Sequence, residues 1–359
     1  MGKLEDDILY REIFMSNKSS GGGGGITPTG TKEINITENG TVTEDVTNYA
    51  SANIVTNIEP YGVGNIAISK NGSHDVSGKA TAVVNVPDAS LKILRSFIEG
   101  YSFNYSDDEL TKIRDYAFYG SGIINLFTNN VSGVGSNAFG NCKNLTIVEL
   151  NGATSIGSNA FGNCKNLKIV ELKGATSIGS SAFLSCANLK KCYLDSCQNI
   201  GADAFHGCVA LANIKIPNVN RIEDNAFYDC IALGHVELPN VTYIGSRAFN
   251  SCSVLDYIEL PNVTVINGGA FAWCKALDHI DLPVIEWIYG NYTFRGCNNL
   301  KYIKIGTQDS TEVARTDGSL EIPTDTKIYV PDSLIDEYKN GTNWSKYASQ
   351  IYPLSEFTE

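Results

Sequence analysis

The chain has few charged residues and almost no methionine. Asp, Glu, Lys and Arg make up 18% of its 359 residues, and Met occurs only twice. Coiled coils and wholly disordered chains carry much more charge, so both classes are excluded. The sequence also lacks any run of about eighteen apolar residues. It therefore predicts no transmembrane helix and no insertion into a membrane.

Basic charge is scarce throughout the chain. The formal net charge is −12, and the flanks carry most of the excess. Residues 91–306 hold 17 basic and 18 acidic side chains, whereas residues 307–359 hold 4 and 10. No segment is basic enough to attract a phosphate backbone, so nucleic acid is excluded as a partner.

The first 25 residues lack the basic start and the apolar core of a signal peptide. They begin MGKLEDDILYREIF, with acids where a leader carries positive charge. We expect synthesis in the cytoplasm without export by the general secretory route. Leu4, Ile8 and Ile13 have the spacing of a short amphipathic helix, and five glycines follow at 21–25. Residues 1–25 are either a docking or homo-oligomerisation handle on a linker or a frayed tail.

A repeat of about 22 residues occupies the middle of the chain. Phe recurs at steps of 21 to 23 residues, with Ala before it in every unit except the last, where Thr293 stands. Cys follows Phe by three residues in eight units, and Leu follows Cys by three. The Phe positions are 118, 139, 161, 183, 205, 227, 249, 271 and 294. Such a fixed period is the mark of a stacked repeat architecture.

Each unit predicts one firm strand and one short strand. The segment HVELP at 235–239 alternates outward and inward residues, which is typical of a half-buried strand. Val241 and Ile244 form a second apolar pair before the next Phe, and the Ala-Phe pair marks a tight turn. One unit cannot bury its apolar face alone. Stacked units, here called rungs, bury it at about 4.8 Å per rung.

The pattern AFxxCxxLxxIxLPxxVxxIGxxAF resembles the BspA-like leucine-rich repeat over roughly residues 110–306. This resemblance implies a mainly β, right-handed leucine-rich-repeat solenoid for residues 91–306. It also implies that the firm strands line a concave side, and that the protein serves adhesion or binding without one shared ligand. An extracellular location, on a cell surface or a virion, follows from the same resemblance.

The flanks predict two smaller units. Residues 33–58 and 65–87 align, with Asn39-Gly40 matching Asn71-Gly72, so a tandem β-hairpin module is expected within 26–90. Its ITENGT wording is similar to segments of tail or minor structural proteins from phages and prophages. Residues 307–359 predict a strand at 328–330 and short helices, which form an α/β cap on the last rung.

The ten cysteines are expected to be reduced and buried. Eight share one repeat position, Cys192 replaces an inward Val or Ile, and Cys197 replaces a small apolar residue. All ten occupy positions where small hydrophobic side chains belong. Side chains stacked in parallel give poor disulfide geometry, and no CxxC pair offers a metal site.

The outward strand positions form two columns that are candidates for binding. The first reads Ile147, Ile169, Lys191, Asn213, His235, Tyr257, His279 and Tyr302. The second, two residues on, reads Glu149, Glu171, Tyr193, Lys215, Glu237, Glu259, Asp281 and Lys304. The predicted ligand-binding residues are Tyr193, His235, Glu237, Tyr257, Glu259, His279, Asp281 and Tyr302. Rings beside carboxylates suit a sugar or a polar protein surface. The alternative is that an exposed sheet simply tolerates these cross-strand pairs.

Catalysis has little support in the sequence. His235 and His279 lie two rungs apart, about 9.6 Å by strand spacing, which is too far to share one zinc ion. No catalytic triad or phosphate-binding loop is present, so we expect no enzyme and no cofactor. The predicted function is recognition of a cell-surface protein or carbohydrate, as an adhesin or as a phage tail-associated protein. The alternative is a structural spacer or virion component without a ligand on the repeat face.

Overall fold

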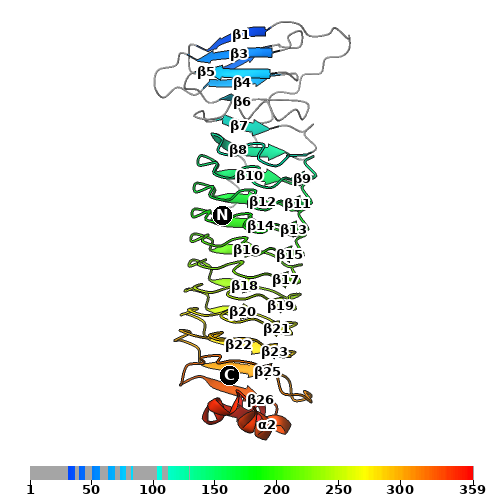
Figure 1. Ribbon diagram of the computed structural model, residues 1–359, viewed down its shortest axis with the longest axis vertical. Coiled ribbons are helices and arrows are strands. Elements are labelled where there is room, and N and C mark those ends of the chain that lie inside the picture. Colours follow the sequence, from blue (N-terminus) through cyan, green and yellow to red (C-terminus); the bar gives the residue numbers. More distant parts are fainter. Residues whose placement is uncertain are drawn as a thin grey trace.

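A computed structural model describes residues 112–128 and 130–358 in full, together with the backbone of seven earlier strands between residues 31 and 106. From residue 112 the chain winds into stacked rungs that form a long, narrow column (Figure 1). Each rung contains one longer strand and one strand of two residues. No helix within the described residues is long and apolar enough to cross a membrane.

The longer strands follow one another along one side of the column. They are β8 (Ile123–Thr128), β10 (Ile147–Leu150), β12 (Ile169–Glu171), β14 (Lys191–Tyr193), β16 (Asn213–Lys215), β18 (His235–Glu237), β20 (Tyr257–Glu259), β22 (His279–Leu282), β24 (Tyr302–Ile305), β26 (Lys327–Val330) and β27 (Ile351–Pro353). Their hydrogen-bonded ladder has three segments, which end at β16, at β20 and at β27.

The two-residue strands form one continuous nine-stranded sheet beside the longer strands. They are β9 (Gly133–Val134), β11 (Ser155–Ile156), β13 (Ser177–Ile178), β15 (Asn199–Ile200), β17 (Arg221–Ile222), β19 (Tyr243–Ile244), β21 (Val265–Ile266), β23 (Trp287–Ile288) and β25 (Arg315–Thr316). All pairs in both ladders are parallel, and Ile147 pairs with Ile169 in register. The predicted 22-residue parallel solenoid is therefore confirmed.

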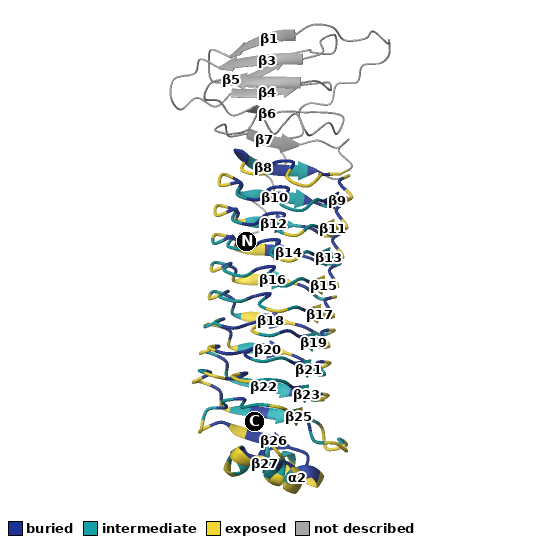
Figure 2. Cartoon of the chain, in the orientation of Figure 1, coloured by how far each residue is buried: buried dark blue, intermediate teal, exposed yellow. Residues whose placement is uncertain are grey.

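A column of stacked phenylalanines forms the centre of the core. The ring centroids of successive Phe residues lie 4.9 to 6.1 Å apart, and the rings are nearly parallel. Figure 2 shows that every described rung contains buried residues. Burial of each such ring contributes about 1.5–3 kcal/mol, so the period of the Phe residues fixes the period of the rungs. The column has no marked curvature in this view, although the family resemblance implied a concave strand face.

The turn around each Phe uses left-handed backbone. In every rung, the residues two before and two after Phe have positive φ, as in Asn137 (55°) and Asn141 (62°) on either side of Phe139. The amide of Phe139 donates to the carbonyl of Ala160 in the next rung at 2.7 Å. Gly, Asn and Asp adopt this conformation at the lowest cost, which favours them at these positions, although Ser181, Arg247 and Trp273 also adopt it.

The cysteine column lies beside the phenylalanines. All ten cysteines are buried and free. Each repeat cysteine donates its thiol proton to the carbonyl of the Phe in the previous rung, as Cys164 does to Phe139 at 3.1 Å. Burial raises the pKa of the Cys186 and Cys297 thiols to about 12. The predicted interior position of the cysteines is confirmed.

The N-terminal strands differ from the prediction. β1 (Thr31–Ile36) pairs in parallel with β3 (Ser51–Thr56), and β3 pairs in parallel with β5 (Ser73–Ser77). β2 (Gly40–Glu44) likewise pairs in parallel with β4 (Gly64–Ile68). A hairpin requires antiparallel neighbours, so the hairpin prediction for residues 26–90 is wrong for these pairs. Alternating residues and Asn-Gly indicate strands and turns, but they do not encode the partner.

The strands β6 (Ala82–Val83) and β7 (Phe103–Ser106) join the longer-strand ladder through β8. The amphipathic helix predicted within residues 4–15 lies outside the described residues.

The C-terminal segment forms the predicted cap. After β26 come η1 (Asp332–Leu334), α2 (Ile335–Asn340), η2 (Ser345–Gln350), β27 and η3 (Leu354–Glu356). The indole nitrogen of Trp344 donates to the carbonyl of Ala314 at 2.7 Å, and the Ala314 amide donates to the Tyr338 hydroxyl at 2.8 Å. Both rings are buried, so the cap closes the apolar end of the column.

Candidate functional site

The parallel register brings most of the predicted residues together on the longer strands. His235 pairs with Tyr257 and Glu237 with Glu259 between β18 and β20. His279 pairs with Tyr302, and Asp281 with Lys304, between β22 and β24. Their side chains point outward because the residues between them, such as Val236 and Ile258, are buried. Seven of the eight predicted residues therefore lie on four neighbouring rungs.

His235, Tyr257, His279 and Tyr302 form a continuous stack, here called the aromatic ladder. Successive ring centroids are 5.4, 4.9 and 4.9 Å apart, and the interplanar angles are 13°, 39° and 20°. His235 is exposed and the other three are half-buried. Because each ring faces its neighbours along the column, the ladder presents ring edges, hydroxyls and imidazole nitrogens to solvent. These groups suit hydrogen bonding and edge contacts.

Carboxylates lie beside the aromatic ladder. Glu237 Oε1 is 3.7 Å from His235 Nε2, and Glu259 Oε1 accepts from the Tyr257 hydroxyl at 3.5 Å. Asp281 pairs with Lys304 at 2.6 Å. Partial burial, with the charges of Glu259 and Asp281, raises the pKa of Tyr257. The tyrosine is therefore a neutral hydrogen-bonding group at physiological pH.

Tyr193 does not join the aromatic ladder. It lies on β14 in the second outward column, in register with Glu171 and Lys215. The intervening rung, β16, carries Asn213 and Lys215 and contributes no ring to the stack. The structure therefore separates Tyr193 from the other seven predicted residues.

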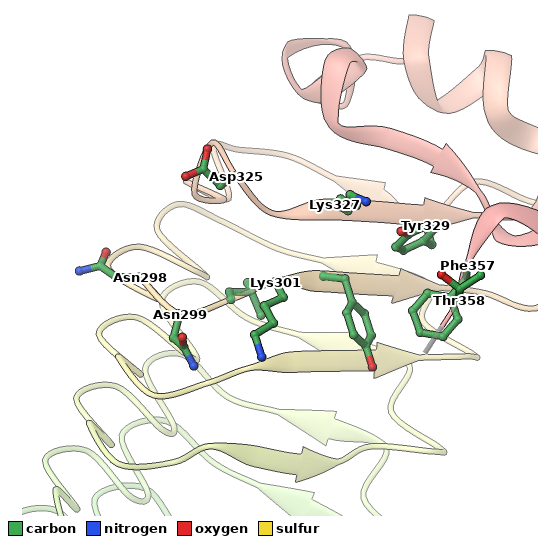
Figure 3. A pocket seen from close by; sticks show the side chains of 10 residues that line it. Asn298, Asn299, Lys301, Asp325, Lys327, Tyr329, Phe357 and Thr358 are labelled. Carbon is green, nitrogen blue, oxygen red and sulfur yellow. The ribbon is translucent and has the colours of Figure 1, made fainter.

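The aromatic stack continues into the cap. Phe357 meets the Tyr302 ring edge-on at 4.9 Å and the Tyr329 ring at 5.0 Å. The ammonium of Lys304 lies 4.5 Å from the centre of the Phe357 ring. A hollow of about 460 Å³ opens beside them, and Asn299, Lys301, Asp325, Lys327 and Thr358 are among its other lining residues (Figure 3).

Three residues beside the hollow were not predicted from the sequence: Tyr329, Lys327 and Phe357. The first two continue the outward columns, since Tyr302 pairs with Lys327 and Lys304 with Tyr329. A 25-residue step between β24 and β26, in place of 22, concealed this continuation. Phe357 follows no repeat position, so no periodic signal points to it.

The site has no arrangement typical of catalysis. Tyr257 stands between His235 and His279, as the register requires. His206 lies on the Phe-turn edge and pairs with Asp203 at 2.9 Å. Within the described residues, no three His, Cys, Asp or Glu side chains are grouped to hold a metal ion. The described residues of the site offer ring edges, hydroxyls, imidazole nitrogens and charges for contact with a partner.

Comparison with solved structures finds leucine-rich repeat proteins from bacteria. A leucine-rich repeat protein from Bacteroides ovatus is 20% identical, with 90% of this chain and 92% of that chain covered and a TM-score of 0.50. A leucine-rich cell surface protein from Faecalibacterium prausnitzii is 22% identical, covering 68% and 83%, with a TM-score of 0.28. The pneumococcal vaccine antigen PcpA is 17% identical, covering 89% and 83%, with a TM-score of 0.31. Of these three, the Bacteroides structure has the TM-score that supports the fold, and at 20% identity it supports the fold alone.

The repeat itself identifies the family. The family model described as the BspA type leucine-rich repeat region matches six copies, over residues 111–234 and 220–315. No curated protein matches the chain. The family match does not extend over residues 33–87, so the resemblance of that segment to phage tail proteins remains a prediction. Because the match spans more than half of the sequence, the chain belongs to the BspA-type leucine-rich repeat family.

Proposed function

We propose that the protein is a non-enzymatic recognition protein, and that the face carrying the aromatic ladder binds a partner at a cell surface. The observation that carries this proposal is the ladder itself. Four half-buried or exposed rings lie in one stack, and carboxylates flank the first three of them, as Glu237, Glu259 and Asp281. Tyr is among the residues enriched at binding hot spots, because its ring offers a large contact and its hydroxyl a hydrogen bond.

The arrangement of the rings favours a protein partner over a glycan. Sugar rings bind aromatic side chains by packing on exposed ring faces. Here the faces of Tyr257 and His279 are turned toward neighbouring rings at 4.9 Å. Their outward edges, together with Glu237 and Glu259, suit polar and basic groups of a protein surface.

The proposal is tested with the double variant Tyr257→Ala, His279→Ala. Labelled protein is titrated onto intact bacterial and animal cells. On cells that bind the unchanged chain, we expect the amount of bound variant to be at least tenfold lower. His206→Ala, Tyr228→Ala is a matched control, because this His–Tyr pair also makes a ring contact, at 4.8 Å, but lies on the Phe-turn edge. Equal binding by both variants would reject the proposal.

A structural spacer is the second candidate function. The regular stacking of the rungs and the C-terminal cap that closes the column suit a rigid rod without a ligand. Placement in a phage tail rests on the wording of residues 33–87 and remains a prediction. Fractionation of source cells before and after DNA-damage induction tests it: protein in purified particles supports the tail placement, and protein in the uninduced envelope rejects it.

A further inference from the structure

Charge on the face of the longer strands is arranged in blocks along the column. This strand face comprises, in each rung from β10 to β24, the two outward strand residues and the residue just before the strand. The rungs of β12, β14 and β16 carry Lys168, Lys190, Lys191 and Lys215, and Glu171 on β12 is the one acidic residue among them. The next three rungs carry Glu237, Asp256, Glu259, Asp278 and Asp281. At the two ends the signs reverse, with Glu149 on β10 and Lys304 on β24.

The sequence of charges is nearly antisymmetric about its centre. A second copy of the face can be related to the first by a half-turn about an axis that runs along the strands between β16 and β18. In that arrangement β16 lies opposite β18, β14 opposite β20, β12 opposite β22, and β10 opposite β24. Four pairs of opposite charge then face one another. They are Lys215 with Glu237, Lys190 with Asp256, Lys168 with Asp278, and Glu149 with Lys304.

We infer that the partner of the strand face is a second copy of this chain, packed face to face with the order of rungs reversed. The two-fold axis runs along the strands between β16 and β18, so each residue meets the same strand position of the opposite rung. This inference rests on the proposed function and names its partner. Because the contact is isologous, every pair occurs twice.

The remaining positions of the strand face fit the same arrangement. Lys191 meets Tyr257, which allows a cation–π contact, and Ile169 meets His279. At the axis, Ala212 meets Gly234 and Asn213 meets His235, which brings no like charges together. The like-charged pair on the face is Glu171 with Asp281. Each of these has a lysine of its own chain beside it, Lys173 at 3.2 Å and Lys304 at 2.6 Å.

The surface is large enough for a specific dimer. Eight rungs at about 4.8 Å and about five residues of strand at about 3.3 Å give an area of roughly 34 Å by 17 Å. That is about 600 Å² on each copy and about 1,200 Å² in total, the lower limit of standard-size interfaces. We expect a reversible dimer whose dissociation constant rises with salt concentration, since opposite charges hold it in register.

Lys190 and Asp256 offer the sharpest test. Both are exposed, and neither has a charged partner within the part of the chain that the structure describes. By contrast, Lys215 already contacts Asp195, and Asp278 contacts Lys301. Lys190→Glu alone and Asp256→Lys alone each turn two attractions into two repulsions. Sedimentation velocity of the full chain should show the dimer dissociation constant of each variant rising about tenfold or more.

Mixing the two variants distinguishes this interface from others. In the mixed dimer, Glu at position 190 of one chain meets Lys at position 256 of the other, and the remaining Asp256 meets Lys190. We expect dimers to return in the equimolar mixture and in the chain that carries both changes. The control variants Lys275→Glu and Asp309→Lys make the same changes of charge at residues outside the strand face. They should leave the dissociation constant within twofold of that of the unchanged chain.

Three results would overturn the inference: a chain that is monomeric at all concentrations, a dimer that both single reversals leave unchanged, or a mixture that does not regain dimers. Cell binding separates this failure from failure of the proposed function. If the chain is monomeric but Tyr257→Ala, His279→Ala still abolishes its binding to cells, the self-association is wrong and the proposed function stands.

Discussion

At the scale of single residues, the cysteine column shows why a repeat position selects one side chain. A thiol fills the space beside the Phe column and donates to the Phe carbonyl of the previous rung, as in Cys208 to Phe183 at 3.2 Å. Ser121 occupies this position in the first rung and contacts Cys142 Sγ at 3.3 Å. A small donor is therefore the common requirement, and Cys meets it without the desolvation cost of a buried hydroxyl.

The buried thiols should lower stability at alkaline pH. The folded pKa of Cys186 is about 12, above the ordinary value of 9.0, because burial disfavours the thiolate. Its contribution to stability is complete below pH 9 and is lost as pH rises toward 12. The free energy of unfolding should fall by up to about 1.4 kcal/mol per pH unit for each such thiol in that window.

Urea unfolding measured at intervals from pH 7 to 11 tests this expectation. Cys197→Ala is a mild comparison, because Ala153 and Ala175 occupy the same position in other rungs. Burial raises the pKa of Cys197 to about 11, so its removal should flatten the fall in stability between pH 9 and 11. A slope unchanged by this substitution would contradict the assignment of the alkaline loss to buried thiols.

Thiol titration gives a second measurement of the same column. All ten cysteines are buried and unlinked, so an aromatic disulfide reagent should react with almost none of them in the native chain. The unfolded chain without reductant should release ten equivalents of chromophore. A count of eight or fewer after unfolding would mean that disulfides are present.

At the scale of elements, the Phe turn depends on residues that tolerate positive φ. Asn163 has φ of 61°, and Gly207 occupies the same position two rungs later. Asn163→Ala should lower the free energy of unfolding by about 1 kcal/mol, whereas Asn163→Gly should change it by only a few tenths. Thermal unfolding of the two variants checks the expectation, and equal losses from both would contradict it.

The cap should protect the last rungs from opening. Trp344 is 2% exposed and donates to the carbonyl of Ala314, a residue beside β25. Trp344→Ala should cost about 3–5 kcal/mol and speed amide exchange first in β24 and β26. If exchange rises uniformly from β10 to β26, the cap is not a local seal.

The positions of the strands were predictable because the same pattern of residues recurs at the same spacing in each unit. The alternation in HVELP placed β18, and the same spacing placed the strands on either side of it. Pairing at the N-terminal end was not predictable from Asn39-Gly40, since a turn signal does not state whether neighbouring strands pair with each other or with the next winding. Phe357 was missed because its contact with Tyr302 depends on the path of the cap. The sequence also could not show that neighbouring rings of the aromatic ladder stack and so cover one another's faces.

At the scale of the whole molecule, stacking turns a one-dimensional repeat into long surfaces. The strands from β10 to β24 follow one another along one side of the column (Figure 1). Their outward face carries both the aromatic ladder and the alternating charge blocks. A single rung holds two or three side chains of this face, so recognition must extend over several rungs. Weak contacts repeated at a fixed spacing can then give specificity through their register.

The most direct test of the account is to find which face is protected on binding. Hydroxyl-radical footprinting of the chain, free and bound to cells or to its own copy, reports the solvent exposure of Tyr257 and His279 alongside Tyr228 and His206. The account predicts protection of Tyr257 and His279 in the bound state, with Tyr228 and His206 unchanged. Protection of Tyr228 and His206 with no change at the ladder would contradict it.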